Sequence, residues 1–241
     1  MGLQIGRRRG ANGCAILVVA TVLFAVSLFL WLVILPDVER DSRAVEESFA
    51  ANIAEYEAIP IGEDVVVTGV LAGNESIRAD IIAVERDELI RFIDETDEDP
   101  SVQWRWDNLE REFPALTLAI EGGVVQTAGG GRFTWRGEGL ETVENGPPSD
   151  EPERYLYAGQ NLTHGATRTF SLRNGDRVTL LGSKTESGSI QVRDLYAGER
   201  EGLAGLIEQS NQVLRFIALI FLGGAVLALV GGSLSILRGR L

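Results

Sequence analysis

The sequence has almost no cysteine, histidine or lysine. Among its 241 residues there is one Cys (Cys14), one His (His164) and one Lys (Lys184). A single Cys excludes an intramolecular disulfide, and one Cys with one His excludes a site built from several such ligands. A Cys–His catalytic pair in the middle of the chain is excluded as well. No G-x-S-x-G elbow and no phosphate-binding glycine loop is found either, so we predict no catalytic residue, no bound cofactor and no metal site.

Because lysine is so scarce, arginine carries nearly all the positive charge, and the middle of the chain is strongly acidic. All 35 acidic residues and 17 of the 22 basic ones lie between Asp37 and Arg215, so this stretch has a net charge of about −18. Such a charge repels nucleic acid and anionic lipid headgroups, and we expect neither as a partner. Many carboxylates with one lysine indicate a halophilic protein, although a GC-rich genome would also favour arginine.

Two long uncharged runs stand near the ends of the chain. Gly10–Pro36 follows three consecutive arginines, and Phe216–Leu237 lies between Arg215 and Arg238. Each exceeds the roughly 20 apolar residues that a helix needs to cross a bilayer. We predict transmembrane helices over residues 12–35 and 216–237. A cleaved signal peptide is the alternative for the first run, but the run is longer than such a core and no A-x-A site follows it.

The charges beside these runs predict their orientation. The basic segments are residues 1–11 and 238–241, at the outer ends of the two runs. Basic residues next to a membrane helix usually remain in the cytoplasm. We therefore predict a two-span protein of the cytoplasmic membrane, with both termini cytoplasmic and the central domain extracellular.

The segment between the two runs reads as a β domain with helical ends. Residues 37–59 and 199–215 carry apolar residues at helical spacing and predict an amphipathic stalk and an amphipathic helix. Residues 60–197 contain short β-branched and aromatic segments separated by Gly, Pro and acidic clusters. The expected fold is an α+β membrane protein with a barrel or sandwich between its two spans.

A weak internal repeat lies within this β region. Gly62–Gly69 and Gly175–Gly182 share the frame G-x2-V-x3-G, and Ile77 and Ile190 follow at the same distance. The frame predicts a turn, a half-buried strand and a glycine where the strand bends. Gene duplication and chance matching both remain open as its origin.

Four groups of residues are candidate sites. Gly224, Ala228 and Gly232 form a small-xxx-small strip that predicts close helix packing, against the first span or against another protomer; small residues facing lipid are the alternative. Trp104, Trp106 and Trp135 are expected to pack in the core, and a binding face for a peptide or a lipid headgroup is the alternative. Asn74 and Asn161 begin N-x-[ST] sequons and are candidate glycosylation sites. The acidic run Asp94–Asp99 predicts a solvated loop, with a cation site as the alternative.

The arrangement resembles the GIDE/BAM ("beside a membrane") family. The resemblance rests on Arg154–Tyr157, the Gly175–Gly182 frame, an amphipathic lead and a Gly-rich span, and Gly62–Gly69 is similar to that family's first strand. It implies an OB-like β domain outside the cytoplasm between two membrane helices. No Cys/His-rich RING follows the second span, so ubiquitin-ligase activity has no residues here to carry it.

From these patterns we expect a non-enzymatic membrane protein whose OB-like domain binds or scaffolds a partner. Its surroundings would be the lipid bilayer, with a membrane-protein partner or a second copy bound through the second span. The alternatives are an envelope hydrolase or protease accessory whose chemistry lies among the carboxylates, a relative of the ligases without a RING, and a subunit of a larger membrane complex.

Overall fold

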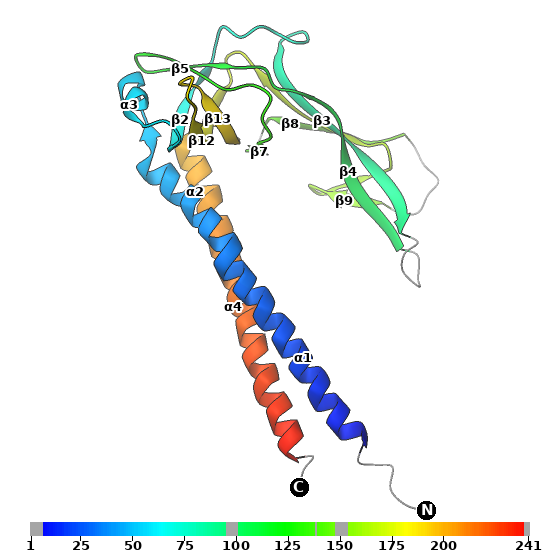
Figure 1. The fold of residues 1–241 in the computed structure, drawn as a ribbon. Coiled ribbons are helices and arrows are strands. Elements are labelled where there is room, and N and C mark those ends of the chain that lie inside the picture. The colour runs from blue at the N-terminus through cyan, green and yellow to red at the C-terminus, as the bar shows by residue number, and fades with distance from the viewer. Residues whose placement is uncertain (1–6, 95–100, 138, 148–153, 239–241) are drawn as a thin grey trace, which may run out of the picture. The chain divides into compact units, whose positions relative to one another are not determined.

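A computed structural model describes residues 7–94, 101–137, 139–147 and 154–238 (Figure 1). The chain forms two compact units, one of Met1–Arg43 with Ala204–Leu241 and one of Ala44–Leu203. The first unit is helical and the second mainly β. The predicted α+β architecture, with two long apolar helices flanking a mainly-β domain, is therefore confirmed at this level.

The helical unit is built from two long helices. The first runs through α1 (Arg7–Phe29), a π-helical turn η1 (Leu30–Ile34) and α2 (Leu35–Glu47), and the second is α4 (Arg200–Arg238). Both are long and apolar enough to cross a membrane. Their large apolar side chains point outward: Phe216 is 65% exposed and Leu227 is 75% exposed.

The two helices lie side by side and run antiparallel (Figure 1). Ser27 donates a hydrogen bond of 3.1 Å from its hydroxyl to the main-chain oxygen of Ala218. Ala218 and Ala225 are fully buried, and so are Ala20 and Ser27 on the first helix. Their seven-residue spacing is that of a coiled-coil seam, in which small residues let two helices approach closely.

The expected stalk over residues 37–59 is divided in the structure. Its helix ends at Glu47, Phe49–Ala50 forms strand β1, and Ile53–Ala58 forms a separate helix, α3. Asn52 begins α3, because its side chain accepts the Glu55 N–H at 3.0 Å while Glu55 accepts the Ala51 N–H at 2.8 Å. This reciprocal capping starts a new helix. The expected helix over 199–215, in contrast, continues into the second apolar run as one helix.

The β unit contains two main sheets and a hairpin. The larger sheet has the order β6-β5-β2-β12-β13-β7 with β1 beside β2, the second has the order β4-β3-β11-β8, and β9 pairs with β10. Their bounds are β2 Asp64–Leu71, β3 Ile81–Asp94, β4 Ser101–Glu112, β5 Thr117–Ile120, β6 Gly123–Gln126, β7 Thr134–Arg136, β8 Glu141–Glu144, β9 Tyr155–Tyr157, β10 Gln160–Leu162, β11 Thr167–Arg173, β12 Arg177–Lys184 and β13 Ile190–Ala197. No sheet closes on itself within the described ranges, so the OB-like barrel is not confirmed.

Two apolar clusters fill the β unit. The main core joins strands of both sheets, with Val67, Leu180 and Leu172 among its fully buried members. A smaller cluster around Leu89 and Leu162 lies where β3 and the β9–β10 hairpin meet. The second sheet thus contributes one end to the main core and the other end to its own small core.

The two copies of the sequence repeat become paired neighbours. β2 and β12 are antiparallel, with Val65 opposite Gly182, Gly69 opposite Val178, and Val67 opposite Leu180 at the centre. The valine of each copy therefore faces the second glycine of the other. A methyl group on Gly69 would overlap the Ala119 oxygen, and one on Gly182 would overlap the Gln191 oxygen. Each glycine allows the next strand outward, β5 or β13, to approach closely.

This arrangement predicts that alanine is not tolerated at either glycine. Gly69→Ala and Gly182→Ala should each lower the free energy of unfolding by about 1–3 kcal/mol, because the new methyl group meets main-chain atoms that cannot rotate away. Denaturant titration followed by tryptophan fluorescence measures this change.

Gly205→Ala is the control for the same substitution in open space. A Cβ atom there meets nothing within 4 Å, and the residue lies in α4. Helix propensity predicts no loss and a gain of up to about 1 kcal/mol. Equal effects at all three glycines would contradict the close-approach explanation.

Candidate functional site

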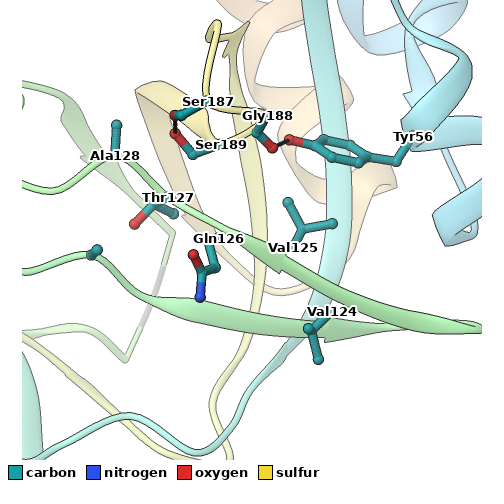
Figure 2. Close-up of a pocket in the computed structure, with 10 residues that line it drawn as sticks. Tyr56, Val124, Val125, Gln126, Thr127, Ala128, Ser187, Gly188 and Ser189 are labelled. Atoms are coloured by element: carbon teal, nitrogen blue, oxygen red, sulfur yellow. Dashed lines mark hydrogen bonds between the residues drawn. The ribbon is translucent and has the colours of Figure 1, made fainter.

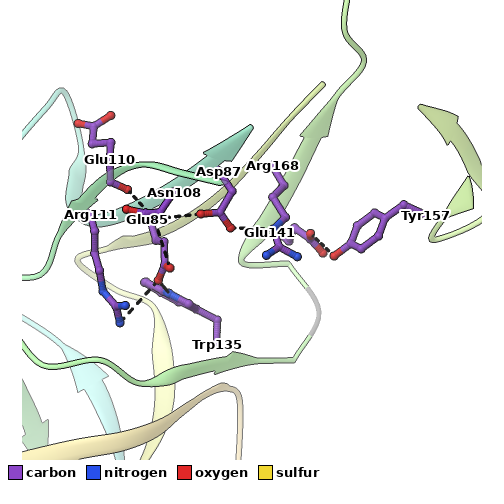
Figure 3. Close-up of polar contacts among 9 residues, drawn as sticks. All are labelled: Glu85, Asp87, Asn108, Glu110, Arg111, Trp135, Glu141, Tyr157 and Arg168. Carbon is purple, nitrogen blue, oxygen red and sulfur yellow. Dashed lines mark hydrogen bonds and ion pairs between the residues drawn. The ribbon is translucent and has the colours of Figure 1, made fainter. Parts of the chain in front are cut away.

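One face of the second sheet carries a chain of polar and aromatic contacts that begins at Arg168. Arg168 on β11 lies opposite Asp87 on β3, and its Nε donates to Asp87 Oδ2 at 2.8 Å (Figure 3). Asn108 on β4 donates from Nδ2 to the other carboxylate oxygen at 2.9 Å. Three neighbouring strands are thus joined through the side chain of Asp87, which is 7% exposed.

Aromatic rings surround the Arg168 guanidinium. Its central carbon lies 4.7 Å from the ring centre of Trp106, 5.6 Å from that of Phe170 and 6.0 Å from that of Tyr157. A cation over such rings is stabilised by their quadrupoles, more so when desolvated. The site for a cation on this face is therefore filled by the protein's own arginine.

The surroundings shift the pKa of two of these groups. Burial raises the pKa of the Tyr157 hydroxyl, and Glu141, which accepts its hydrogen bond at 2.7 Å, raises it further against the opposing effect of Arg168. Burial lowers the pKa of Arg168, but its interactions with Tyr157 and Asp87 outweigh burial and raise it. Both groups keep their ordinary protonation state at neutral pH.

A second group of contacts ties β7 to the same face. Glu85 on β3 accepts a hydrogen bond of 2.5 Å from Trp135 Nε1 and lies 3.7 Å from an Arg111 nitrogen. The Trp135 ring stacks on Phe170, with 5.7 Å between ring centres. The face therefore connects the two sheets (Figure 3).

The three tryptophans named as a possible binding face all pack within the β unit, as the core-packing interpretation expects. Trp104 and Trp106 pack on Tyr155 and Tyr157 of the hairpin, at 6.1 Å and 5.4 Å. Trp135 packs against the main core beside Phe133. Within the described chain their rings are occupied by neighbours in the same unit. Arg168 is not among the residues predicted from the sequence, where its only signal is its alternation with Phe170 and Leu172 on one face of a strand.

The small residues predicted to pack the second span differ in how far they are buried. A Cβ atom on Gly224 would lie 3.4 Å from the Leu23 side chain of α1. Gly232 is buried and Ala228 is half-buried. The predicted strip, whose residues lie four apart, does not include Ala218 and Ala225. These two are the fully buried alanines of α4. Their spacing of seven residues is the sequence pattern that indicates this helix contact.

The two sequons differ in how their asparagines are used. The Asn74 side chain accepts the Thr117 N–H at 2.6 Å and donates to the Thr117 oxygen at 3.0 Å, so it holds the start of β5. Asn161 is exposed on β10. Thr163 of that sequon is buried, and its side chain bonds to Asn145. The Asn161 amide is therefore the more accessible of the two, whereas the Asn74 amide is engaged in hydrogen bonds.

A separate pocket lies between α3, β6 and the turn that joins β12 to β13 (Figure 2). It encloses about 510 Å³. Its walls are the segment Val124–Ala128, Ala115, the turn residues Ser187–Ser189, and Tyr56. The Tyr56 hydroxyl donates to the Gly188 oxygen at 2.7 Å and fixes the turn against α3. Burial raises the pKa of this hydroxyl.

The pocket has hydroxyl groups in its walls. The hydroxyl oxygens of Thr185, Ser187 and Ser189 lie 2.8–2.9 Å from one another in a triangle. Thr127, which bridges to Ile190 beside these residues, is 2% exposed, and its hydroxyl oxygen accepts the Leu116 N–H at 2.8 Å. Across the described residues no acceptor is found for the hydrogen of the Thr127 hydroxyl. These groups can bind a ligand by hydrogen bonds.

The described residues contain no group of three or more His, Cys, Asp or Glu side chains placed to hold a metal ion. Most of the acidic run Asp94–Asp99 lies outside the described residues. His164 is exposed, and its Nδ1 accepts the Arg91 N–H at 3.1 Å.

Comparison of the chain with protein-family models, with curated proteins and with solved structures finds no match. The resemblance to the GIDE/BAM family therefore stays a prediction.

The raised pKa values of Tyr56 and Tyr157 predict a loss of stability at high pH. An unfolded tyrosine ionises near pH 10, below the folded pKa, so the unfolded state loses protons first. The free energy of unfolding should be unaffected below about pH 10 and should fall above it, by at most about 1.4 kcal/mol per pH unit for each tyrosine. Denaturant titrations across this range test the slope.

Variants assign this slope to the two tyrosines. The double variant Tyr56→Phe with Tyr157→Phe should reduce the slope, and Tyr155→Phe is the matched control. An unchanged slope in the double variant would contradict the assignment.

Alanine should lower the stability of the protein strongly at Asn74 and hardly at all at Asn161. Asn74→Ala should lower the free energy of unfolding by about 1–3 kcal/mol, because the Thr117 N–H loses its acceptor while the Thr117 oxygen keeps only the Ala72 N–H. Asn161→Ala should change it by no more than about 0.5 kcal/mol, since the side chain is exposed. Thermal or denaturant unfolding of the two variants measures the difference, and similar losses would show that Asn74 does not hold β5.

Proposed function

We propose that the chain is a two-span membrane protein whose β unit binds or scaffolds a partner outside the cytoplasmic membrane. The observation that carries this proposal is the division of the helical surface. Small residues are buried between the two helices, while large apolar residues such as Phe216 and Leu227 are exposed. Lipid is the solvent in which that surface is favourable.

The antiparallel pairing supports the proposed orientation. It brings the start of α1, at Arg7, and the end of α4, at Arg238, to one end of the helical unit (Figure 1). Both ends carry arginines, which favours one compartment for the two termini. At the other end Glu39 and Arg215 form an ion pair of 2.8 Å, suitable for a polar boundary. The proposed topology has cytoplasmic termini and an extracellular β unit.

The binding role is supported by how the β unit uses its polar groups. The buried carboxylate of Asp87 is paired with Arg168, and Tyr157 is bonded to Glu141, so these side chains stabilise the fold. The pocket beside Tyr56, in contrast, is lined by uncharged polar side chains that include Ser187, Ser189 and Gln126. A relationship to the GIDE/BAM family, with an OB-like domain and without ligase activity, fits this role.

The packing of the two helices indicates which surface of the second span is left to bind a partner. Gly224 lies against Leu23 of the same chain. This contact favours intramolecular pairing along that strip. A membrane partner or a second copy would then bind through the outer faces of the helices.

Two measurements test the topology in one experiment. In a Cys14→Ser background, Ser76→Cys places a single thiol on an exposed loop of the β unit. A membrane-impermeant maleimide added to intact cells should label this thiol. A reporter fused after Leu241 should be active only in the cytoplasm. No labelling before lysis, with full labelling afterwards, would overturn the proposed orientation.

A further inference from the structure

We infer that the pocket between α3, β6 and the β12–β13 turn binds a neutral, hydroxyl-bearing ligand of the saccharide class. The inference rests on the proposed role of the β unit as a binding module and adds the chemistry of what it binds. The volume of about 510 Å³ lies within the usual range for small-molecule sites.

The charge of the walls excludes ionic ligands first. None of the ten lining residues is charged, although the stretch from Asp37 to Arg215 carries about −18. An anion would find no arginine or lysine in the walls and would be repelled by the surrounding carboxylates. A cation would find no carboxylate in the walls to replace its water. A neutral ligand meets neither cost.

The hydroxyl group of Thr127 indicates a ligand that accepts hydrogen bonds. The residue is 2% exposed, and its oxygen is engaged by the Leu116 N–H. Its hydrogen is left for an acceptor at the pocket wall. A buried donor without a partner is costly, so a ligand oxygen at this position is favourable.

The wall formed by the β12–β13 turn can both donate and accept. Thr185, Ser187 and Ser189 form a triangle in which each hydroxyl can be the donor. Such a group can reverse the direction of its bonds to match a neighbour. A sugar hydroxyl, which also donates and accepts, fits this wall better than a group with one fixed role.

Apart from Gln126, the remaining walls are apolar, and they are held rigid by main-chain contacts. Ala115, Val124 and Ala128 offer aliphatic surface of the kind on which the C–H groups of a sugar ring pack. The bond from Tyr56 to Gly188 and the bond of 2.8 Å from Ala128 N to Ile190 O hold the walls together. A pocket held in place before binding loses less entropy when a ligand enters.

The experiment uses the full-length protein in lipid nanodiscs, because sugar-headed detergents would compete. The probes are D-glucose and N-acetyl-D-glucosamine, with glucose 6-phosphate and glucosamine as charged analogues. Saturation-transfer NMR and calorimetry should show saturable binding of at least one neutral sugar, about tenfold or more tighter than its charged analogue. Maltotriose distinguishes a polysaccharide from a free sugar as the source, since a longer chain should bind more tightly only in the first case.

Variants tie the binding to this pocket. Ser187→Ala and Ser189→Ala should each weaken it by about threefold to tenfold, the range for loss of one neutral hydrogen bond. Ser171→Ala on β11 is the matched control and should leave affinity unchanged. Thr127→Val removes the buried hydroxyl but also the acceptor for Leu116, so Thr127→Ser, which restores both, is compared with it. Binding should be lost in the first and retained in the second.

Three results would overturn the inference. They are the absence of binding by both neutral sugars, equal binding of the charged analogues, and binding unaffected by the serine variants. Saturable binding of a capped alanine tripeptide with none of the sugars would replace the saccharide with a peptide. Maleimide labelling in intact cells tests the topology independently of the sugar titration. If the titration fails while the labelling result is as expected, this inference is rejected and the proposed topology stands.

Discussion

The pairing of β2 with β12 is the constraint on which the rest of the β unit depends. The two strands are far apart in the sequence, and their register is fixed by valine facing glycine at both ends. β3 follows β2 and β11 precedes β12, so this pairing also brings β3 and β11 together in the second sheet. The bonds between Asn74 and Asn174 hold the two corners side by side. Asp87 and Arg168 meet because of a pairing made in the other sheet.

Arginine and lysine have different tasks in this acidic unit. Arg136 pairs with Asp194 and Arg168 with Asp87, and both carboxylates are 7% exposed. A buried ion pair adds little net stability but strongly penalises a register in which one partner is unpaired. The one lysine, Lys184, donates from Nζ to the main-chain oxygens of Tyr56, Glu57 and Ile59 at 2.8–3.0 Å. A compact ammonium suits three converging oxygens, whereas a planar guanidinium does not.

The sequence predicted what is local or compositional. The two apolar runs, the short strands and the glycine frame were all visible, since each depends on neighbouring residues. The end of the stalk was also a local signal, because Asn52 and Glu55 form a capping pair. The frame predicts a bend at its second glycine, and the β12–β13 register does shift at Gly182. The sequence does not show that Gly69 and Gly182 are also needed for close contact with another strand. The contact between Asp87 and Arg168 spans 81 residues, and periodicity carries no information about such pairings.

The pocket also follows from the central pair, which explains why composition could not reveal it. Beyond Gly182 the register of β12 on β13 shifts, and the hairpin continues to the turn with Ser187 and Ser189. Beyond Gly69 the neighbouring strand is β5, whose partner β6 ends beside Thr127. The bridge between Thr127 and Ile190 then joins the two walls. Bulges next to functional sites commonly redirect side chains in this way. The two glycines that let the flanking strands approach thus also determine where the uncharged hydroxyl groups of this acidic unit converge.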